Sequence, residues 1–125
     1  MEAALRHELQ SITEIKDSIY PTNAPESADK PYLVYARITT EITKTLDGYT
    51  DKQAQSYMFS VMAKKYSDMV SIRKDIETIL LAMPGTTIGD DVTFYVEDLD
   101  INRIAEQYEH QLGVNRGIID FTIYF

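Results

Sequence analysis

Apolar residues near the start of the chain recur at the spacing of an α-helix. The recurring positions are Leu5, Leu9, Ile12, Ile15 and Ile19. Gaps of three and four residues place all of them on one helical face, which would pack against a core. The sequence therefore predicts a first helix over residues 5–19, which Pro21 ends because it lacks a backbone N–H. A loop over residues 21–31 should follow, since this stretch holds three prolines and no large apolar side chain.

Residues 32–63 carry the alternating pattern of a long antiparallel β-hairpin. Over residues 32–46, apolar side chains share one parity, in a stretch rich in β-branched residues. These apolar positions are Val34, Ala36, Ile38, Ile42 and Leu46. Asp47-Gly48 then favours a turn, so we expect a loop over residues 47–51. The second strand should cover residues 53–63, in which Tyr57, Phe59, Val61 and Ala63 alternate with Met58, Ser60 and Met62.

A second helix is predicted over residues 67–83. Ser67 is a suitable N-cap, Asp68 complements the positive end of the helix dipole, and Pro84 stops the helix. Seven apolar residues form a wide stripe on one face: Met69, Val70, Ile72, Ile76, Ile79, Leu80 and Met83. After a loop over residues 86–91, we expect a third strand over residues 92–97 and a last strand over residues 117–125.

The segment between those last two strands fits two descriptions. Apolar residues at helical spacing predict a short helix over residues 100–113, capped by Asp100 and ended by Gly113. Alternatively, the third and fourth strands extend toward each other around a loop. We favour the helix, so the expected element order is α, β, β, α, β, short α, β. This order predicts an α+β domain: a mostly antiparallel sheet with a long β-hairpin and two main helices packed on one face.

Composition narrows the class of protein. The 125 residues suit one domain with a single core, and no apolar run approaches the roughly 20 residues needed to cross a bilayer. The first residues are too polar for a signal peptide, and the absence of cysteine excludes disulfides and thiolate metal sites. With 12 Lys and Arg against 20 Asp and Glu, the net charge of -8 disfavours binding to duplex DNA or to anionic membranes. We therefore expect a cytosolic domain whose partners are proteins.

The sequence offers little for catalysis. His7 and His110 have no second ligand at metal-binding spacing, so we interpret both as solvated surface residues. The run from Asp98 to Asn102 lacks the glycine and glutamate that a calcium loop requires. No phosphate-binding glycine loop or nucleophile elbow occurs. We predict a protein that is not an enzyme and holds no metal or cofactor. The alternative, a small hydrolase or ligand-binding domain, would need a pocket where carboxylates such as Asp98 and Glu109 converge.

Two features favour contact with other protein chains. Tyr49 lies at the expected hairpin tip, where an aromatic side chain has little core to join. The chain ends on an apolar strand through Phe125, and an exposed edge of such a strand invites pairing with another chain. We name Tyr49, Thr50 and Asp51 at the tip and Phe125 at the terminal edge as candidate contact residues. Together they suggest self-assembly.

Several short motifs follow one another in a recognisable order. They are Tyr-Pro-Thr-Asn-Ala-Pro at residues 20–25, Lys-Pro-Tyr-Leu-Val-Tyr at residues 30–35, Leu-Asp-Gly at residues 46–48 and Asp-Phe-Thr-Ile-Tyr at residues 120–124. In this order and spacing, with a helix before and another between, the chain resembles the small tail-completion, or tail-terminator, proteins of long-tailed bacteriophages and prophages. The likeness spans nearly the whole chain. Residues 100–113 depart from the family pattern because they look more helical.

The resemblance implies a non-catalytic structural protein of the virion, located where the tail meets the neck and made in the host cytoplasm. Such proteins form a ring, usually six-fold, that caps the finished tail tube and joins it to the head. The implied partners are other copies of the chain, the tail tube protein and a head-completion or neck protein. DNA would be passing cargo only, with no membrane involved. An acidic ring would favour sliding of DNA over adhesion to the wall.

Other roles in virion assembly fit the same pattern. A head-completion or stopper protein of the neck, or the tube subunit itself, would also use hairpins and sheets. A dimeric adaptor unrelated to viruses is a further alternative. Rings that form on tail ends would favour the terminator role, whereas spontaneous long tubes would favour the tube subunit.

Overall fold

The computed structural model describes residues 1–22, 31–46, 48–111 and 113–125. The N-terminal half contains α1 (Glu2–Leu9), a single 3-10 turn η1 (Thr13–Ile15), and the strands β1 (Ile19–Pro21), β2 (Tyr32–Thr45) and β3 (Gly48–Ala63). The C-terminal half contains α2 (Tyr66–Leu81) and the strands β4 (Thr87–Gly89), β5 (Thr93–Tyr95), β6 (Asp98–Glu109) and β7 (Val114–Tyr124).

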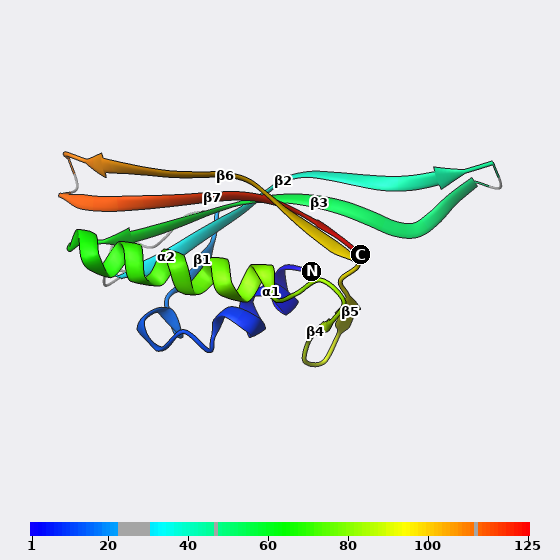
Figure 1. Cartoon of the computed structure of the whole chain (residues 1–125), viewed down its shortest axis with the longest axis horizontal. Helices are drawn as coiled ribbons and strands as arrows, with labels where there is room; N and C mark the ends of the chain where they lie inside the picture. The colour runs from blue at the N-terminus through cyan, green and yellow to red at the C-terminus, as the bar shows by residue number, and fades with distance from the viewer. Residues whose placement is uncertain (23–30, 47, 112) are drawn as a thin grey trace.

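Five strands form the main sheet, in the order β1-β2-β3-β7-β6. β1 pairs with β2 in parallel, and the other three pairings are antiparallel. β2 with β3 and β6 with β7 form two long hairpins, which extend toward opposite ends of the sheet (Figure 1). β4 and β5 form a small separate sheet. The predicted α+β class, with a mostly antiparallel sheet and a long hairpin, is confirmed.

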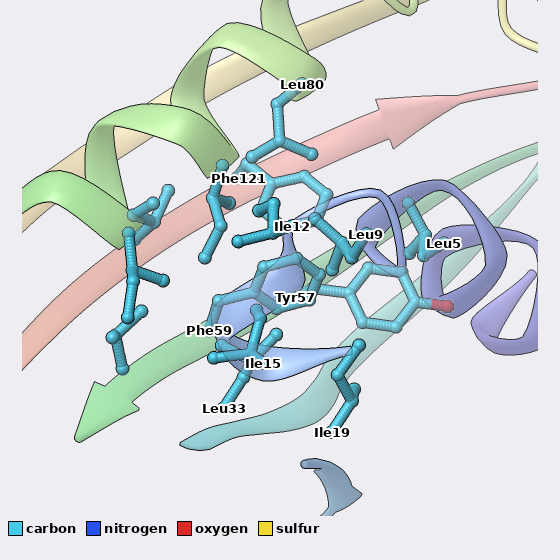
Figure 2. Packing of buried hydrophobic residues seen from close by; sticks show 14 of the residues in the cluster. Leu5, Leu9, Ile12, Ile15, Ile19, Leu33, Tyr57, Phe59, Leu80 and Phe121 are labelled. Atoms are coloured by element: carbon cyan, nitrogen blue, oxygen red, sulfur yellow. The ribbon is translucent and has the colours of Figure 1, made fainter. Parts of the chain in front are cut away.

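The core lies between the helices and one face of the main sheet (Figure 1). Three aromatic side chains of the central strands form its middle: the rings of Phe59 and Phe121 meet edge to face at 4.8 Å, and Tyr57 stacks on Phe121 at 5.7 Å. Figure 2 shows apolar side chains of the N-terminal segment and Leu80 of α2 gathered around them. Burying each large side chain contributes roughly 1.5–3 kcal/mol, so this cluster stabilises the packing of helices on sheet.

The predicted first helix is correct in its buried residues and wrong in its extent. All five periodic positions are buried, yet α1 ends at Leu9 and Ile19 already belongs to β1. Ile12 adopts an extended backbone, with φ -82° and ψ 106°, and separates α1 from η1. A short helix, a 3-10 turn and a strand can each place an apolar side chain on the sheet every three or four residues. The spacing therefore indicates which residues are buried, and it does not require one continuous helix.

The short helix expected over residues 100–113 is wrong, because this segment forms β6 and the start of its hairpin. The pairing of β6 with β7 shifts between Ile101 and Arg103, which marks a β-bulge. On the far side of the bulge, Ile104 pairs with Ile119, so Ile101 and Ile104 share the helix-covered face although three residues separate them. A bulged strand thus reproduces the spacing of a helix. The alternative of two extended strands around a loop is the observed one.

The apolar parity predicted for β2 does not form the core. Leu33 pairs with the buried Val61 and is itself fully buried, whereas Val34 lies on the opposite face. A second register shift, between Arg37 and Thr39, changes which positions share a face along the rest of β2. Ile42 therefore falls on the helix-covered side, opposite to Val34. Ile38, beside this shift, is 58% exposed instead of buried.

Three predicted boundaries also differ. The hairpin loop expected over residues 47–51 is shorter, because β3 begins at Gly48, whose φ of 116° suits glycine; Asp47 lies outside the described residues. Ser67 is not the N-cap of α2, because the helix begins at Tyr66, after Lys65 as the cap. The loop expected over residues 86–91 contains β4, and the third strand shortens to β5, which pairs with β4.

Candidate functional site

The β2–β3 hairpin forms an arm that runs beyond the helix layer before it turns (Figure 1). Its pairing continues as far as Thr45 with Gly48. Ile38 and Ile42 are more than half exposed on this arm, and Leu46 at its turn is fully exposed. A projecting pair of strands that presents aliphatic side chains to solvent is suited to contact with another chain.

Three of the predicted contact residues lie at the tip of this arm. Tyr49, Thr50 and Asp51 are among the first residues of β3, and Tyr49 pairs with Lys44. Asp51 is exposed, whereas the side chains of Tyr49 and Thr50 lie outside the described part of the structure. The structure therefore brings the three residues to one tip, and their role as contacts stays a prediction.

Phe125 does not lie on a free edge of the sheet. β7 is an interior strand, flanked by β3 and β6. Phe125 itself exchanges two backbone hydrogen bonds with Gln53, of 2.7 and 2.9 Å, and its ring packs edge to face on Phe94 at 5.2 Å. The expectation of a terminal edge is wrong because residues 98–109, interpreted in part as a helix, form the strand that covers β7. Contact of Phe125 with a partner chain stays a prediction.

The long unpaired edges of the sheet are β6 on one side and, beyond the short edge strand β1, the outer part of β2 on the other. β6 pairs with β7 on one side only, along its whole length. β1 covers the outer side of β2 only at residues 33–35, and no other described strand pairs there. Both edges carry exposed apolar side chains, Ile104 and Tyr108 on β6 and Ile38 and Ile42 on β2. Sequence reasoning missed these edges because it placed a helix where β6 lies.

A polar cluster that the sequence did not reveal ties α2 to β6. The guanidinium of Arg73, almost buried, donates to Glu77 at 2.6 Å and to Glu106 at 3.0 Å. The hydroxyl of Tyr66 donates to the other Glu106 oxygen at 2.6 Å, and this hydrogen bond raises the pKa of Tyr66. Gly117 of β7 has no side chain, and Met69 and Arg73 of α2 pack closely against it. The cluster holds the edge strand against the helix layer.

The face of the sheet opposite the helices carries small, apolar and paired charged residues. On it, Arg103 donates to Asp120 at 2.8 Å, and Arg116 lies 3.5 Å from Glu109 and donates to the hydroxyl of Ser60 at 3.1 Å. Each of these arginines is thus already matched by an acid. Such a face has weak attraction for phosphate groups, since that attraction depends on uncompensated positive charge.

A hollow of about 900 Å³ opens where α1 meets the segment between β4 and β5. Its charged lining consists of Glu2, Arg6, His7, Asp90 and Asp91. The hollow is wide and open, and neither Asp98 nor Glu109 lines it. Within the described residues, no group of three His, Asp or Glu side chains is placed to hold a metal ion.

The two carboxylates considered for a hydrolase do not meet. Asp98 and Glu109 are the first and last residues of β6, so about 35 Å separates them at the rise of an extended strand. Both histidines are exposed, as predicted, and His110 packs against the ring of Tyr108 at 4.9 Å. In the described part of the chain, no helix has the length and apolar character to cross a membrane. The pocket considered for a hydrolase, where Asp98 and Glu109 would converge, is therefore not formed by these residues.

Comparison with known proteins gives a match in structure alone. No protein-family model matches the chain, and no curated protein matches its sequence. Among solved structures, this chain is similar to a protein chain in the virion of a native gene transfer agent particle. The TM-score is 0.69 and the sequence identity is 12%. The similarity covers 99% of this chain and 92% of that chain. Over nearly the whole length of the chain, the fold therefore has a counterpart in a virion.

Proposed function

We propose that the chain is a structural protein of a phage-type virion, a tail terminator whose copies form a ring that caps the tail tube and joins it to the neck. The observation that carries the proposal is the likeness, over 99% of the chain, to a chain of a gene transfer agent virion. At 12% identity this likeness is one of fold, and it supports a structural role in a phage-type virion. The more specific terminator role rests on the sequence resemblance to tail-completion proteins. The partners in this role are further copies of the chain, the tail tube protein and a head-completion or neck protein.

Two physical features support this role. The β2–β3 arm with its exposed Leu46 reaches beyond the helix layer (Figure 1), as a contact between stacked virion parts requires. The net charge of -8 repels phosphates, which suits a ring through which DNA passes without binding. Asp98 and Glu109 lie at opposite ends of β6, so they do not form the pair of carboxylates that the alternative hydrolase function would need. A structural role without catalysis is the function that these observations support best.

Removal of the chain from virion-producing cells tests the role. We expect unjoined heads and tails in electron micrographs, with joined particles restored by the wild-type gene. A variant that replaces residues 44–51 by a two-residue Asn-Gly turn keeps the register in which Ile42 pairs with Gln53. It shortens the arm and should restore joining poorly. A variant with substitutions on the exposed side of α2, such as Leu81→Gln, serves as a control and should restore it. Joined virions formed at normal yield without the chain would contradict the proposal.

A further inference from the structure

The two edges of the main sheet run in opposite directions. Three successive antiparallel pairings connect β2 to β6 through β3 and β7, so β2 and β6 are antiparallel to each other. If one copy is rotated so that its β2 lies beside β6 of the next, with helices on the same face, the two edges meet as an antiparallel pair. The same contact then repeats from copy to copy, and such a head-to-tail contact can close into a ring.

Exposed apolar side chains give this contact a register. Ile38 and Ile42 on β2 are 58% and 52% exposed, and Ile104 and Tyr108 on β6 are 45% and 50% exposed. On each strand, the second of these residues comes four positions after the first. One antiparallel register therefore places Ile42 opposite Ile104 and Ile38 opposite Tyr108. Apolar cross-strand pairs of this kind stabilise a sheet.

Ile42 and Ile104 also share a face of the sheet in this register. Ile42 pairs with Gln53, which lies two and four residues from the buried Gln55 and Tyr57 and therefore has their orientation. Ile104 pairs with the buried Ile119. Ile42 and Ile104 both lie on the helix-covered side of the sheet, at positions that no described helix covers. In the proposed contact each would bury the other.

β1 limits the contact at the point where β6 ends. β1 occupies the outer side of β2 as far as Tyr35, where Thr22 donates to the Tyr35 carbonyl at 2.7 Å. In the register described above, Glu109, the last residue of β6, falls opposite Arg37 of the neighbouring copy. The neighbouring β6 thus ends just before it would collide with β1.

We propose that adjacent copies of the chain pair edge to edge, residues 37–42 of one copy with residues 104–109 of the next, so that the main sheet continues from copy to copy. This inference rests on the proposed ring and names the surface that closes it. An edge of twelve residues such as β6 is a liability for unspecific pairing unless it is covered. Pairing with β2 of a second copy covers it and leaves the tip of the β2–β3 arm available for another partner.

Pairs of cysteines test the register, because the natural chain has none. The full-length variants I42C/I104C and I38C/Y108C are concentrated until they assemble and then treated with a mild oxidant or a short bismaleimide. Links within one chain are excluded, since β3 and β7 separate the two edges by about 14 Å and disulfides require Cα atoms within about 7 Å. We expect a ladder of two, three and more covalently joined chains from both variants.

The control variant I42C/Y108C uses the same exposed positions in a register displaced by four residues, which is about 13 Å along a strand. It should show no more ladder than the single variants I42C and Y108C. Equal ladders from all three double variants, or none from I42C/I104C and I38C/Y108C, would overturn the pairing. Electron micrographs of the same samples separate the two proposals. Rings without the specific ladder refute the pairing alone, whereas a specific ladder in open filaments refutes the ring.

Discussion

Gly117 determines how closely α2 approaches the sheet. A Cβ at this position would lie 2.7 Å from the Sδ of Met69 and 3.3 Å from the Cδ of Arg73. We predict that Gly117→Ala lowers the free energy of unfolding by about 1–3 kcal/mol, the usual cost of overpacking a core, measured by urea denaturation. In a Met69→Ala background, where the colliding side chain is gone, the same substitution should cost much less. An equal cost in both backgrounds would show that this contact is not the cause.

Arg73 is expected to contribute more to stability than an arginine in an exposed ion pair. Its side chain is 11% exposed and bonds to two glutamates, whereas Arg103, paired with Asp120, is 57% exposed. We predict that Arg73→Met costs about 1.5–3 kcal/mol, because partly buried glutamates lose their partner. The matched Arg103→Met should cost less than about 1 kcal/mol. Chemical denaturation of both variants checks the order, and equal losses would contradict it.

Tyr57 should make stability depend on alkaline pH. Burial raises the pKa of its hydroxyl well above that of a free tyrosine. Above about pH 10 the unfolded chain loses this proton while the folded chain retains it, so the free energy of unfolding falls as the pH rises. Below about pH 9 both states keep the proton and the effect is absent. Thermal unfolding between pH 8 and 11, chosen to bracket that range, should show a shallower decline for Tyr57→Phe than for the wild type; parallel curves would contradict this assignment.

At the scale of elements, the sequence predicted well the strand and the helix whose apolar side chains pack on the core in a regular pattern. The alternation that ends in Ala63 and the apolar stripe around Ile76 located β3 and α2 to within a few residues. Bulges caused most of the errors. One makes Ile101 and Ile104 share a face at helical spacing, and another puts Val34 and Ile42 on opposite faces of the sheet although both belong to the predicted apolar parity. A bulge depends on the partner strand, which no local pattern reveals. The sheet edges, and with them the surfaces that we propose for assembly, therefore appeared only in the structure.

The arm and the edge strands should differ from the core in amide hydrogen exchange. In the monomer, amides of residues 39–53 should exchange faster than those around Phe59 and Phe121, because little buried apolar surface holds the arm. On assembly, residues 37–42 and 104–109 should gain protection, whereas residues near Leu81 on the exposed side of α2 should not. Mass spectrometry of both states measures this. Protection confined to other segments would place the contact elsewhere.

At the scale of the whole molecule, three properties suit the proposed ring. The two edges of one sheet can meet in antiparallel register, the arm projects past the helix layer, and the surface carries a net charge of -8. A ring built through the edges would leave the arms available for the tube or the neck and would repel the DNA that passes through it. The likeness to a chain of a gene transfer agent virion is consistent with this combination.

The most direct test of the ring is electron microscopy of the concentrated wild-type protein, paired with its mass in solution. We predict closed rings with a central hole at least about 20 Å across, the scale of a B-DNA duplex, and a mass equal to a whole number of chains of 14.3 kDa. If the free protein is monomeric, the rings should appear on the ends of purified tails. A dimer of fixed size, or a monomer that forms no ring on tail ends, would contradict the central claim.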